Sequence, residues 1–309
     1  MPMSPLNAGF RRTCAGIRRR LQRLPLVSVI TATYNWSSVL RYAIQSVLWQ
    51  TYPHFELLVI GDGCTDDSEA VTKSFRDWRV RWHNLPENSG SQPAPNNKGL
   101  ELARGDYVAY LGHDDVWHPT HLGLLVRAMH ASAGDVAYTN AVMIGPEGSN
   151  IRVVTGESLS GRYERGMLVV PSSMMHRRSM VKDIGGWRDF RTIPVAPEMD
   201  LLTRAFDGGK RFTPVSALTV FKFNSAYRPN SYVEKPCHEQ AEYVRRIQHE
   251  PDFVAREWNE INRVKELGLV AHYPAVPEVP HPKPLGWEVH QSRRIRGLPP
   301  LATSLVPSP

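Results

Sequence analysis

Two adjacent carboxylates, Asp114 and Asp115, follow an apolar run that begins at Tyr107. The run has the pattern of a buried strand, so both acids are expected at the strand's carboxyl end, where open α/β sheets place their ligands. Carboxylate oxygens suit hard cations such as Mg²⁺ or Mn²⁺, which commonly share their coordination with substrate phosphates. Either acid could instead cap a helix that begins near Pro119, so this motif alone leaves both interpretations open.

Polar residues also follow the first two predicted strands. The segment 27–35 ends in Thr33, Tyr34 and Asn35, where an aromatic ring could stack on a flat base, although simple turn chemistry is an equally good explanation. Asp62 stands just past the second strand, and its carboxylate could accept a hydrogen bond from uracil or another base. These residues predict a nucleotide site on the same edge of the sheet as the two acids.

A second pair of acids, Glu198 and Asp200, lies in the first turn of a helix predicted to begin at Pro197. Glu198 shares a face with the apolar residues that follow it, so its side chain is expected to point inward. Asp200 is expected to pair with Arg204 one turn later and to face solvent. The helix start should keep Glu198 ionised, as a proton acceptor must be. The alternative is that both acids only complement the helix dipole.

The elements that must position these residues alternate between strand and helix from Pro25 to about Gly145. Strands are expected at 26–31, 55–60, 80–85, 107–111 and 136–144, with helices at 37–48, 68–75, 96–104 and 119–132 between them. Such alternation favours an α/β fold, with a mostly parallel sheet and helices on both faces.

After Gly145 the pattern changes. A short helix closed by glycines 185 and 186, the helix from Pro197 and an extended segment at 211–223 are followed by two amphipathic helices near 238–249 and 252–267. Prolines are dense from Tyr273 onward and predict a loosely structured tail. The domain interpretation is a basic tail at 1–24, an α/β domain at 25–235 with halves at 25–145 and 146–235, C-terminal helices at 236–270 and a Pro-rich tail at 271–309.

Composition excludes several protein classes. The 309 residues are 41% hydrophobic and 22% charged, as in ordinary globular proteins. No apolar run approaches the roughly 18 residues that span a bilayer, and no secretory signal is recognisable, so a cytoplasmic location is expected. Three scattered cysteines argue against a disulfide framework. Arginines in the first 24 residues contribute to the net charge of +7 and could contact an anionic membrane or form a solvated tail; no nucleic-acid partner is expected.

Taken in order, the motifs resemble family-2 glycosyltransferases with the GT-A fold, a Rossmann-like nucleotide-binding architecture, across about residues 25–225. The segment 27–35 resembles the family's opening strand, and 60–68 resembles its acidic Asp-Asp-Gly-Ser-Thr-Asp turn. The segment 111–115 falls on the Asp-x-Asp metal motif. The glycine pair before Trp187, followed by 197–200, resembles the acceptor-side turn and the acidic motif that holds the catalytic base.

The resemblance implies a role for each matching residue. Asp114 aligns with the metal-coordinating aspartate, with Asp115 beside it, and Glu198 is the implied base, with Asp200 as the second candidate. The implied substrate-binding residues are Thr33, Tyr34, Asp62, Asn97, His113 and Trp187.

Two departures from the family pattern matter. Gly112 replaces the first aspartate of Asp-x-Asp, so the ribose contact is either missing or supplied by His113 or water. Pro197 and Glu198 replace the family's Glu-Asp pair, which leaves a longer carboxylate at the position of the base.

The implied activity is inverting transfer of a sugar from a nucleotide-diphosphate donor, with uridine favoured, to a hydroxyl of a glycan, lipid-linked or protein acceptor. Mg²⁺ or Mn²⁺ would stabilise the departing diphosphate. Two alternatives stay open. A nucleotidyltransferase is disfavoured because no glycine-rich triphosphate loop lies near the first strand. A catalytically inert binding or scaffolding module on the same fold is kept open by Gly112 and the altered base motif.

Overall fold

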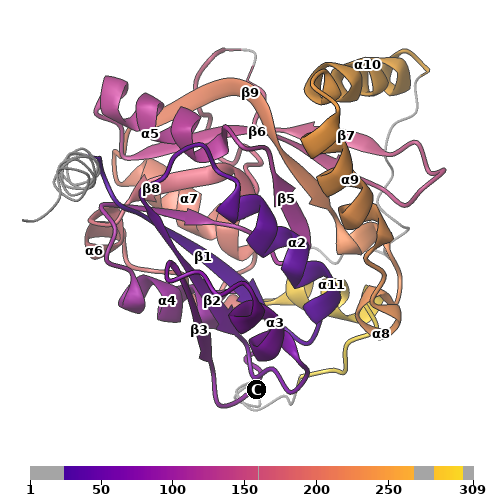
Figure 1. The fold of residues 1–309 in the computed structure, drawn as a ribbon. Coiled ribbons are helices and arrows are strands. Elements are labelled where there is room, and N and C mark those ends of the chain that lie inside the picture. Colours follow the sequence, from indigo (N-terminus) through magenta and orange to yellow (C-terminus); the bar gives the residue numbers. More distant parts are fainter. Residues whose placement is uncertain (1–23, 159, 268–281, 302–309) are drawn as a thin grey trace, which may run out of the picture.

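The structure is a computed structural model that describes residues 24–158, 160–267 and 282–301. The predicted basic tail, apart from Leu24, and the segments 268–281 and 302–309 lie outside this part. Within the described residues, one nine-stranded sheet has the order β3-β2-β1-β4-β8-β6-β9-β5, with β7 paired to β6 (Figure 1). The predicted α/β class, with helices on both faces of the sheet, is confirmed.

The first half of the sheet is parallel. Its strands are β1 (Val27–Thr33), β2 (Phe55–Gly61), β3 (Val80–Asn84) and β4 (Tyr107–Tyr110). Thr33 pairs with Gly61, so β1 and β2 end together, and Asp62 N donates to Thr33 O at 2.8 Å. Tyr110 pairs with Ile30, so the chain after β4 runs beside the last residues of β1. Strand register therefore brings residues 33–34, 62 and 111–114 to one edge.

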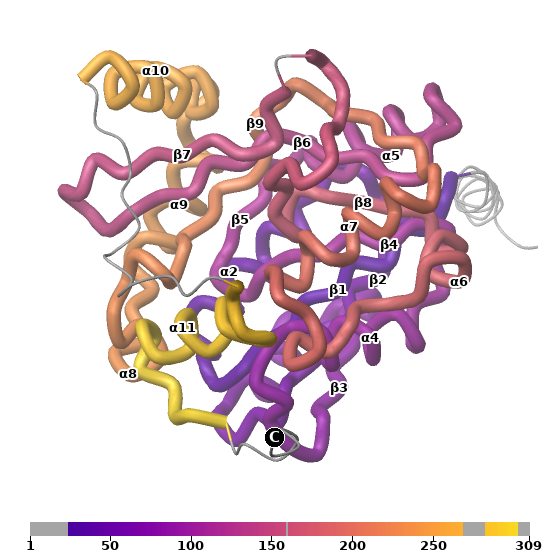
Figure 2. Tube along the Cα trace, turned by 180° about the vertical axis from the view of Figure 1, so that it is seen from behind, coloured from indigo at the N-terminus to yellow at the C-terminus, as the bar shows by residue number. Residues whose placement is uncertain are grey.

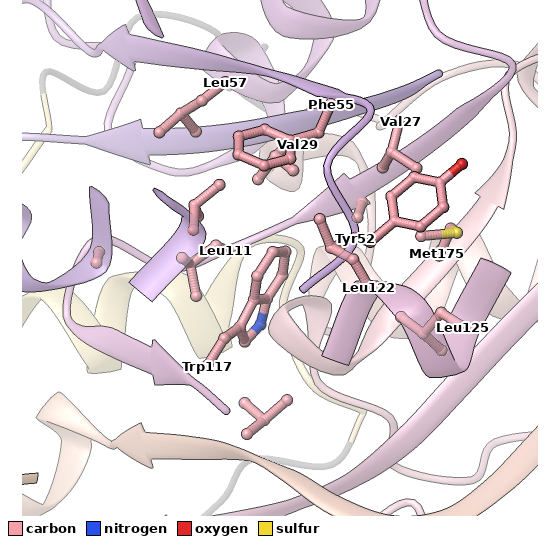
Figure 3. Packing of buried hydrophobic residues seen from close by; sticks show 14 of the residues in the cluster. Val27, Val29, Tyr52, Phe55, Leu57, Leu111, Trp117, Leu122, Leu125 and Met175 are labelled. Carbon is pink, nitrogen blue, oxygen red and sulfur yellow. The ribbon is translucent and has the colours of Figure 1, made fainter. Parts of the chain in front are cut away.

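Helices cover both faces of this parallel half because its strands are apolar on both sides. On one face, α2 (Ser37–Leu48) and α5 (His121–Ser132) contribute to a core cluster that includes Val29. Figure 3 shows Val29, Leu57, Leu111 and Trp117 in this cluster. On the other face, residues of α6 (Met180–Ile184) and α7 (Pro197–Asp207) pack with Ile30, and α4 (Pro93–Leu102) lies beside β1 and β2. The short helix α3 (Ser68–Ser74) lies against α2 and β3.

The second half of the sheet is mixed. Its strands are β5 (Asp115–Trp117), β6 (Val136–Ile144), β7 (Arg152–Thr155), β8 (Met174–Arg177) and β9 (Phe212–Phe223). β8 is antiparallel to both β4 and β6, β6 is parallel to β9, and β5 is antiparallel to β9. β5 and β7 were not predicted, because three or four residues carry too little periodicity to be recognised. Three 3-10 turns complete this half at Pro171–Ser173, Phe190–Thr192 and Ser225–Tyr227.

The C-terminal helices are α8 (Ser231–Glu234), α9 (His238–His249), α10 (Phe253–Glu266) and α11 (Trp287–Ile295). α9 and α10 form a third core cluster with β9, as the two predicted amphipathic helices should. The prediction of a loosely structured tail is wrong at 287–295, where α11 begins after Gly286 at a φ of 70°. Backbone bonds from Asn230 N to Ile295 O (2.9 Å) and from Tyr232 N to Arg296 O (3.1 Å) hold it beside α8 (Figure 2). No helix in the described ranges has the length and apolarity needed to cross a bilayer.

Candidate active site

Of the paired acids, Asp114 lies between β4 and β5, and Asp115 is the first residue of β5. Asp114 is 8% exposed and Asp115 is fully buried. A Cβ added to Gly112 would lie 2.8 Å from Asp115 Oδ2 and 3.2 Å from Asp114 Oδ1, so both carboxylates converge on this glycine. An aspartate at position 112 would have to displace them. The alternative that either acid caps the next helix is wrong, because Thr120 occupies the cap position of α5.

Asp115 is held by two partners. Its Oδ2 accepts from Ser172 Oγ at 2.5 Å and from Lys222 Nζ at 3.2 Å, whereas its Oδ1 is buried without a partner among the described residues. Lys222 reaches this position because it pairs with Asp115 in the register of β5 and β9. Burial raises the pKa of Asp115, although Lys222 opposes the shift. Burial would lower the pKa of Lys222, but Asp115 and Asp114 raise it above its ordinary value.

Asp114 differs from its neighbour in its electrostatics. Burial would raise its pKa, but the cations Lys222 and Arg296, together with His113 when its ring is protonated, lower it below the ordinary value. The lowered pKa keeps the Asp114 carboxylate ionised, and this carboxylate and that of Asp115 both lie near Gly112. This donor set suits an ion that takes its remaining ligands from phosphate and water, as Mg²⁺ usually does. Within the described residues, no group of three or more His, Cys, Asp or Glu side chains could form an all-protein metal cage.

His113 connects the acidic loop to its surroundings. Its Nδ1 lies 3.2 Å from Ala32 O and its Nε2 lies 3.2 Å from the Tyr232 hydroxyl. Trp36 and Tyr232 pack edge-on around its ring, with centroids 5.9 Å and 5.8 Å away. Burial lowers the pKa of His113, so the neutral imidazole is favoured.

After β2, Asp62 is buried and organises a loop. Its carboxylate accepts from Ser89 N (2.9 Å), Asn88 Nδ2 (3.0 Å) and Gly90 N (3.3 Å). Burial raises its pKa, while these hydrogen bonds act in the opposite direction. A carboxylate has about four acceptor positions, so three donors leave capacity for one more.

β1 ends in a threonine hydroxyl without a hydrogen-bond partner, and a turn follows it. Thr33 Oγ1 is buried without a partner among the described residues, and Tyr34 beside it is half-buried. Turn chemistry is carried by Asn35 at a φ of 44°, whose Oδ1 accepts from Thr65 N at 2.7 Å. The chain thereby leaves the Tyr34 ring outside the hydrogen bonds of the turn.

The two acids of α7 have different surroundings. Asp200 pairs with Arg204 at 2.8 Å, as predicted, but its expected solvent exposure is wrong: it is 8% exposed and also contacts Arg188 at 3.4 Å. Arg204 donates in addition to Ile184 O at 2.5 Å and Gly186 O at 2.8 Å. Asp200 therefore anchors the glycine turn, which draws it inward.

Glu198 is half-buried and accepts one side-chain hydrogen bond, from Gln92 Nε2 at 3.0 Å. Burial raises its pKa, although its own backbone N–H at the helix start, Lys222 and Arg296 lower it. The helix start thus favours the ionised form, as expected, but burial has the larger effect on the pKa. A carboxylate with one weak partner and a raised pKa is suited to accept a proton near neutral pH.

Asn97 and Trp187 are joined to each other. Asn97 Nδ2 donates to Trp187 O at 2.8 Å, and Trp187 N donates to Asn97 Oδ1 at 2.9 Å. The Trp187 ring is 3% exposed and lies edge-on to Tyr110, with centroids 5.0 Å apart. Stacking of this ring on a sugar would require it to leave the core, whereas the Asn97 pair links α4 to the acceptor-side turn.

Shared charges bring the separate acids into one cluster. Lys222 and Arg296 both lower the pKa of Asp114 and both act against the raised pKa of Glu198. The carboxylates of Asp62 and Asp114 both contribute to the raised pKa of Tyr232, after burial. The predicted nucleotide, metal and base residues are thus within electrostatic reach of the same group of charged side chains.

Those cations were missed by sequence reasoning. Lys222, Arg293 and Arg296 match no motif, and the two arginines lie in the segment predicted to be loose. Lys222 alone offered a signal, since it is a lone lysine between Phe221 and Phe223 in an otherwise apolar run. A single charge in a buried strand usually has a buried partner.

Comparison with known proteins identifies the family. Residues 28–182 match the family model "Glycosyl transferase family 2". The "Putative teichuronic acid biosynthesis glycosyltransferase TuaG" of Bacillus subtilis is 35% identical over 127 residues, which is 40% of this chain and 50% of the relative. "Protein CgeD" of the same organism is 30% identical over 181 residues, 53% of this chain and 42% of the relative. The chain spans half or less of the length of these relatives.

Solved structures share the fold at low identity. S. aureus TarS 1-349 in complex with UDP-GlcNAc superposes with a TM-score of 0.55 at 19% identity, covering 86% of this chain and 81% of TarS 1-349. Mannosyltransferase PcManGT from Pyrobaculum calidifontis, with GDP-Man and Mn²⁺, gives a TM-score of 0.52 at 13% identity, covering 80% and 76% of the two chains. With half of its residues matched by the family model, the chain belongs to glycosyltransferase family 2, and its fold is GT-A-like.

Proposed function

We propose that this chain transfers a sugar, with inversion, from a nucleotide-diphosphate donor to an acceptor hydroxyl. The observation that carries the proposal is the environment of Glu198, a carboxylate with a raised pKa near the same cations as Asp114. Family membership supports a glycosyltransferase over the nucleotidyltransferase and the inert module considered from the sequence. The UDP-GlcNAc and UDP complexes of TarS support a uridine donor.

The donor would bind along the carboxyl edge of the parallel strands. Tyr34 would stack on the base, Thr33 would offer its unpartnered hydroxyl, and Asp62 would accept a base N–H while holding the 88–90 loop. His113 would contact the ribose as a neutral ring. Asn97 and Trp187 would border the acceptor side through their reciprocal bonds.

Asp114 and Asp115 would hold a divalent ion together with the donor phosphates. When bound, Mg²⁺ or Mn²⁺ supplies charge that stabilises the departing diphosphate. The ionised state of Asp114 and the unpartnered Oδ1 of Asp115 support this assignment. The Mn²⁺ complex of PcManGT is a further support.

Glu198 would accept the proton of the acceptor hydroxyl as its oxygen attacks the anomeric carbon. The bond between that carbon and the diphosphate oxygen breaks on the opposite face, so the configuration inverts and the nucleoside diphosphate leaves. Asp200 is the weaker candidate for the base because its carboxylate is engaged by Arg204 and Arg188. Holding both substrates in line contributes about 7–11 kcal/mol to such reactions.

The acceptor would be a glycan, lipid-linked or protein hydroxyl in polysaccharide or glycoconjugate biosynthesis, a setting that the name of TuaG supports. We propose a cytoplasmic location, with peripheral membrane contact through the basic segment 1–24 as an addition to it.

The test compares Glu198→Gln with Glu266→Gln, an exposed glutamate on α10. Release of nucleoside diphosphate would be followed with a panel of nucleotide sugars in Mg²⁺ and in Mn²⁺. Glu198→Gln should reduce turnover at least about 100-fold, the usual contribution of a positioned acid or base, while donor binding persists. Glu266→Gln should match the unmodified chain. Full activity of Glu198→Gln would reject the base assignment.

A further inference from the structure

Helix α11 directs two arginines towards the site, and they are engaged differently. We propose that Arg296 binds the diphosphate of the donor, and that Arg293 positions the loop that holds Asp62. The inference rests on the proposed nucleotide-diphosphate donor and adds a binding residue from outside the family-matched segment 28–182.

Arg293 is 5% exposed, and both of its terminal nitrogens are engaged, whereas its Nε is buried without a partner among the described residues. One terminal nitrogen donates to Gly90 O at 2.8 Å and the other to Pro299 O at 3.0 Å. Gly90 N in turn donates to Asp62, so Arg293 acts on the Asp62 carboxylate through the loop. Leu301 packs against the same glycine, where an added Cβ would lie 2.4 Å from its Cδ1. The end of the described chain therefore braces the 88–90 loop.

Arg296 is partly buried but has no such partners. Among the described residues its side chain forms no hydrogen bond and no ion pair, and its Nε is fully buried. Its guanidinium lies 5.9 Å from the centroid of the Tyr232 ring. Its backbone is fixed by the bond from Tyr232 N, so the helix end is held in place.

A partly buried guanidinium without an anion is unfavourable, because it has lost water without gaining hydrogen bonds. Its planar set of donors matches two oxygens of a phosphate group. Lys222 is already committed to Asp115, so Arg296 is the cation of the cluster with free donors. Its charge acts on Asp114, the residue that would share a metal with the same diphosphate.

The order of the two arginines agrees with the order of groups in a nucleotide. Arg293 binds the carbonyl of Gly90, whose N–H donates to Asp62 at the base end. The Arg296 guanidinium lies over the ring of Tyr232, whose hydroxyl is 3.2 Å from Nε2 of His113, the residue before Asp114 at the diphosphate end. Arg296 is the C-cap of α11 and keeps helical backbone angles, so the two arginines, three residues apart, lie on one face of the helix. Arg294 lies between them in sequence and is exposed, so it provides a matched control.

The experiment measures binding by isothermal titration calorimetry in Mg²⁺ buffer. The probes are UDP, UMP and uridine, together with GDP, GMP and guanosine. Arg296→Ala should weaken binding of the diphosphate by about 10- to 100-fold, as expected for lost charge-assisted hydrogen bonds, and should leave the nucleoside unaffected. The affinity of Arg296→Lys for the diphosphate should lie between that of Arg296→Ala and that of the unmodified chain, because lysine keeps the charge but lacks the planar set of donors. Arg294→Ala should behave like the unmodified chain.

Selective loss of the diphosphate is the result that a purely structural role would not produce. Equal weakening of nucleoside and diphosphate, in either Arg296→Ala or Arg296→Lys, would overturn the inference and leave the proposed function intact. Unchanged diphosphate binding in Arg296→Ala would overturn it as well. If the unmodified chain binds neither UDP nor GDP, the proposed donor class fails and the inference fails with it, an outcome recognisable before any variant is made.

Discussion

The acids and the cations of the site come from different regions of the molecule. Asp62 and Asp114 follow strands of the parallel half, inside the segment 28–182 that matches the family model. Lys222, Arg293 and Arg296 come from β9 and α11, beyond that segment. The first region contains the motifs that resemble those of the family and supplies these two acids. The second region matches no motif and supplies the positive charges.

The difference shows why the parallel half alone does not make the site. Buried carboxylates are costly unless cations or hydrogen bonds compensate them. Asp115 has no exposure and depends on Ser172 and Lys222, which follow it by 57 and 107 residues. Lys222, from the later region, thus supplies positive charge that the buried Asp115 needs. Changes in the later region should therefore affect the metal binding and sugar transfer assigned to residues of the first region.

The largest expected effect is in the first region. Asp114→Asn should lower transfer by about 100- to 1,000-fold, because it removes the ionised carboxylate assigned to the metal and its diphosphate. The Mg²⁺ dependence of nucleotide binding should fall with it, as measured by calorimetry with and without the ion. Asp67→Asn, at an exposed aspartate before α3, is the matched control. Retained metal-dependent binding in Asp114→Asn would contradict the assignment.

The next effect tests the second region. Lys222→Met should lower the free energy of unfolding by about 3 kcal/mol, because it leaves Asp115 buried without its cation. Chemical denaturation of this variant and of Lys182→Met, at an exposed lysine on α6, gives the comparison. If the two variants are equally stable, the ion pair does not compensate the burial of Asp115.

The smallest expected effect is a pH dependence of turnover and stability that arises from Glu198. This residue accepts a hydrogen bond from Gln92 in the first region and is acted on by Lys222 and Arg296 of the second. Its pKa is raised by burial, so turnover should fall on the acid side at a pH above the ordinary glutamate range. The folded chain then holds this proton more tightly than the unfolded chain, so stability should decrease as pH rises from the unfolded pKa to the folded pKa. Turnover and thermal midpoint would both be recorded against pH. Glu198→Gln should remove this component from the stability profile, and an unchanged profile would argue against the raised pKa.

Much of the scaffold could be predicted from local pattern. Alternating apolar runs and helical periodicity predicted the four parallel strands, α2, α5 and α9, and they put Asp62 and Asp114 at strand ends. Residues that follow parallel strands all lie at the same carboxyl edge of the sheet. Their proximity can therefore be predicted from the strands alone, without knowing how the side chains pack. The GT-A resemblance followed from the same residues.

Local pattern assigned different environments to the two acids of α7, and the one assigned to Asp200 was wrong. Helical spacing correctly paired Asp200 with Arg204 but put the pair in solvent. The structure buries it because Arg204 also binds carbonyls of the glycine turn, and that contact belongs to another segment. Glu198 is left with Gln92, which lies at the start of α4, 106 residues earlier, and helical spacing within α7 cannot predict this partner.

The sequence by itself determined the fold class, the family and the strand ends on which the acids stand. Tertiary structure decided which charges oppose them: strand register pairs Asp115 with Lys222, and docking of α11 brings Arg293 to Gly90, 203 residues earlier. The physical reason is that periodicity reports how one element is buried, whereas the partner of a buried charge depends on which distant elements pack against it.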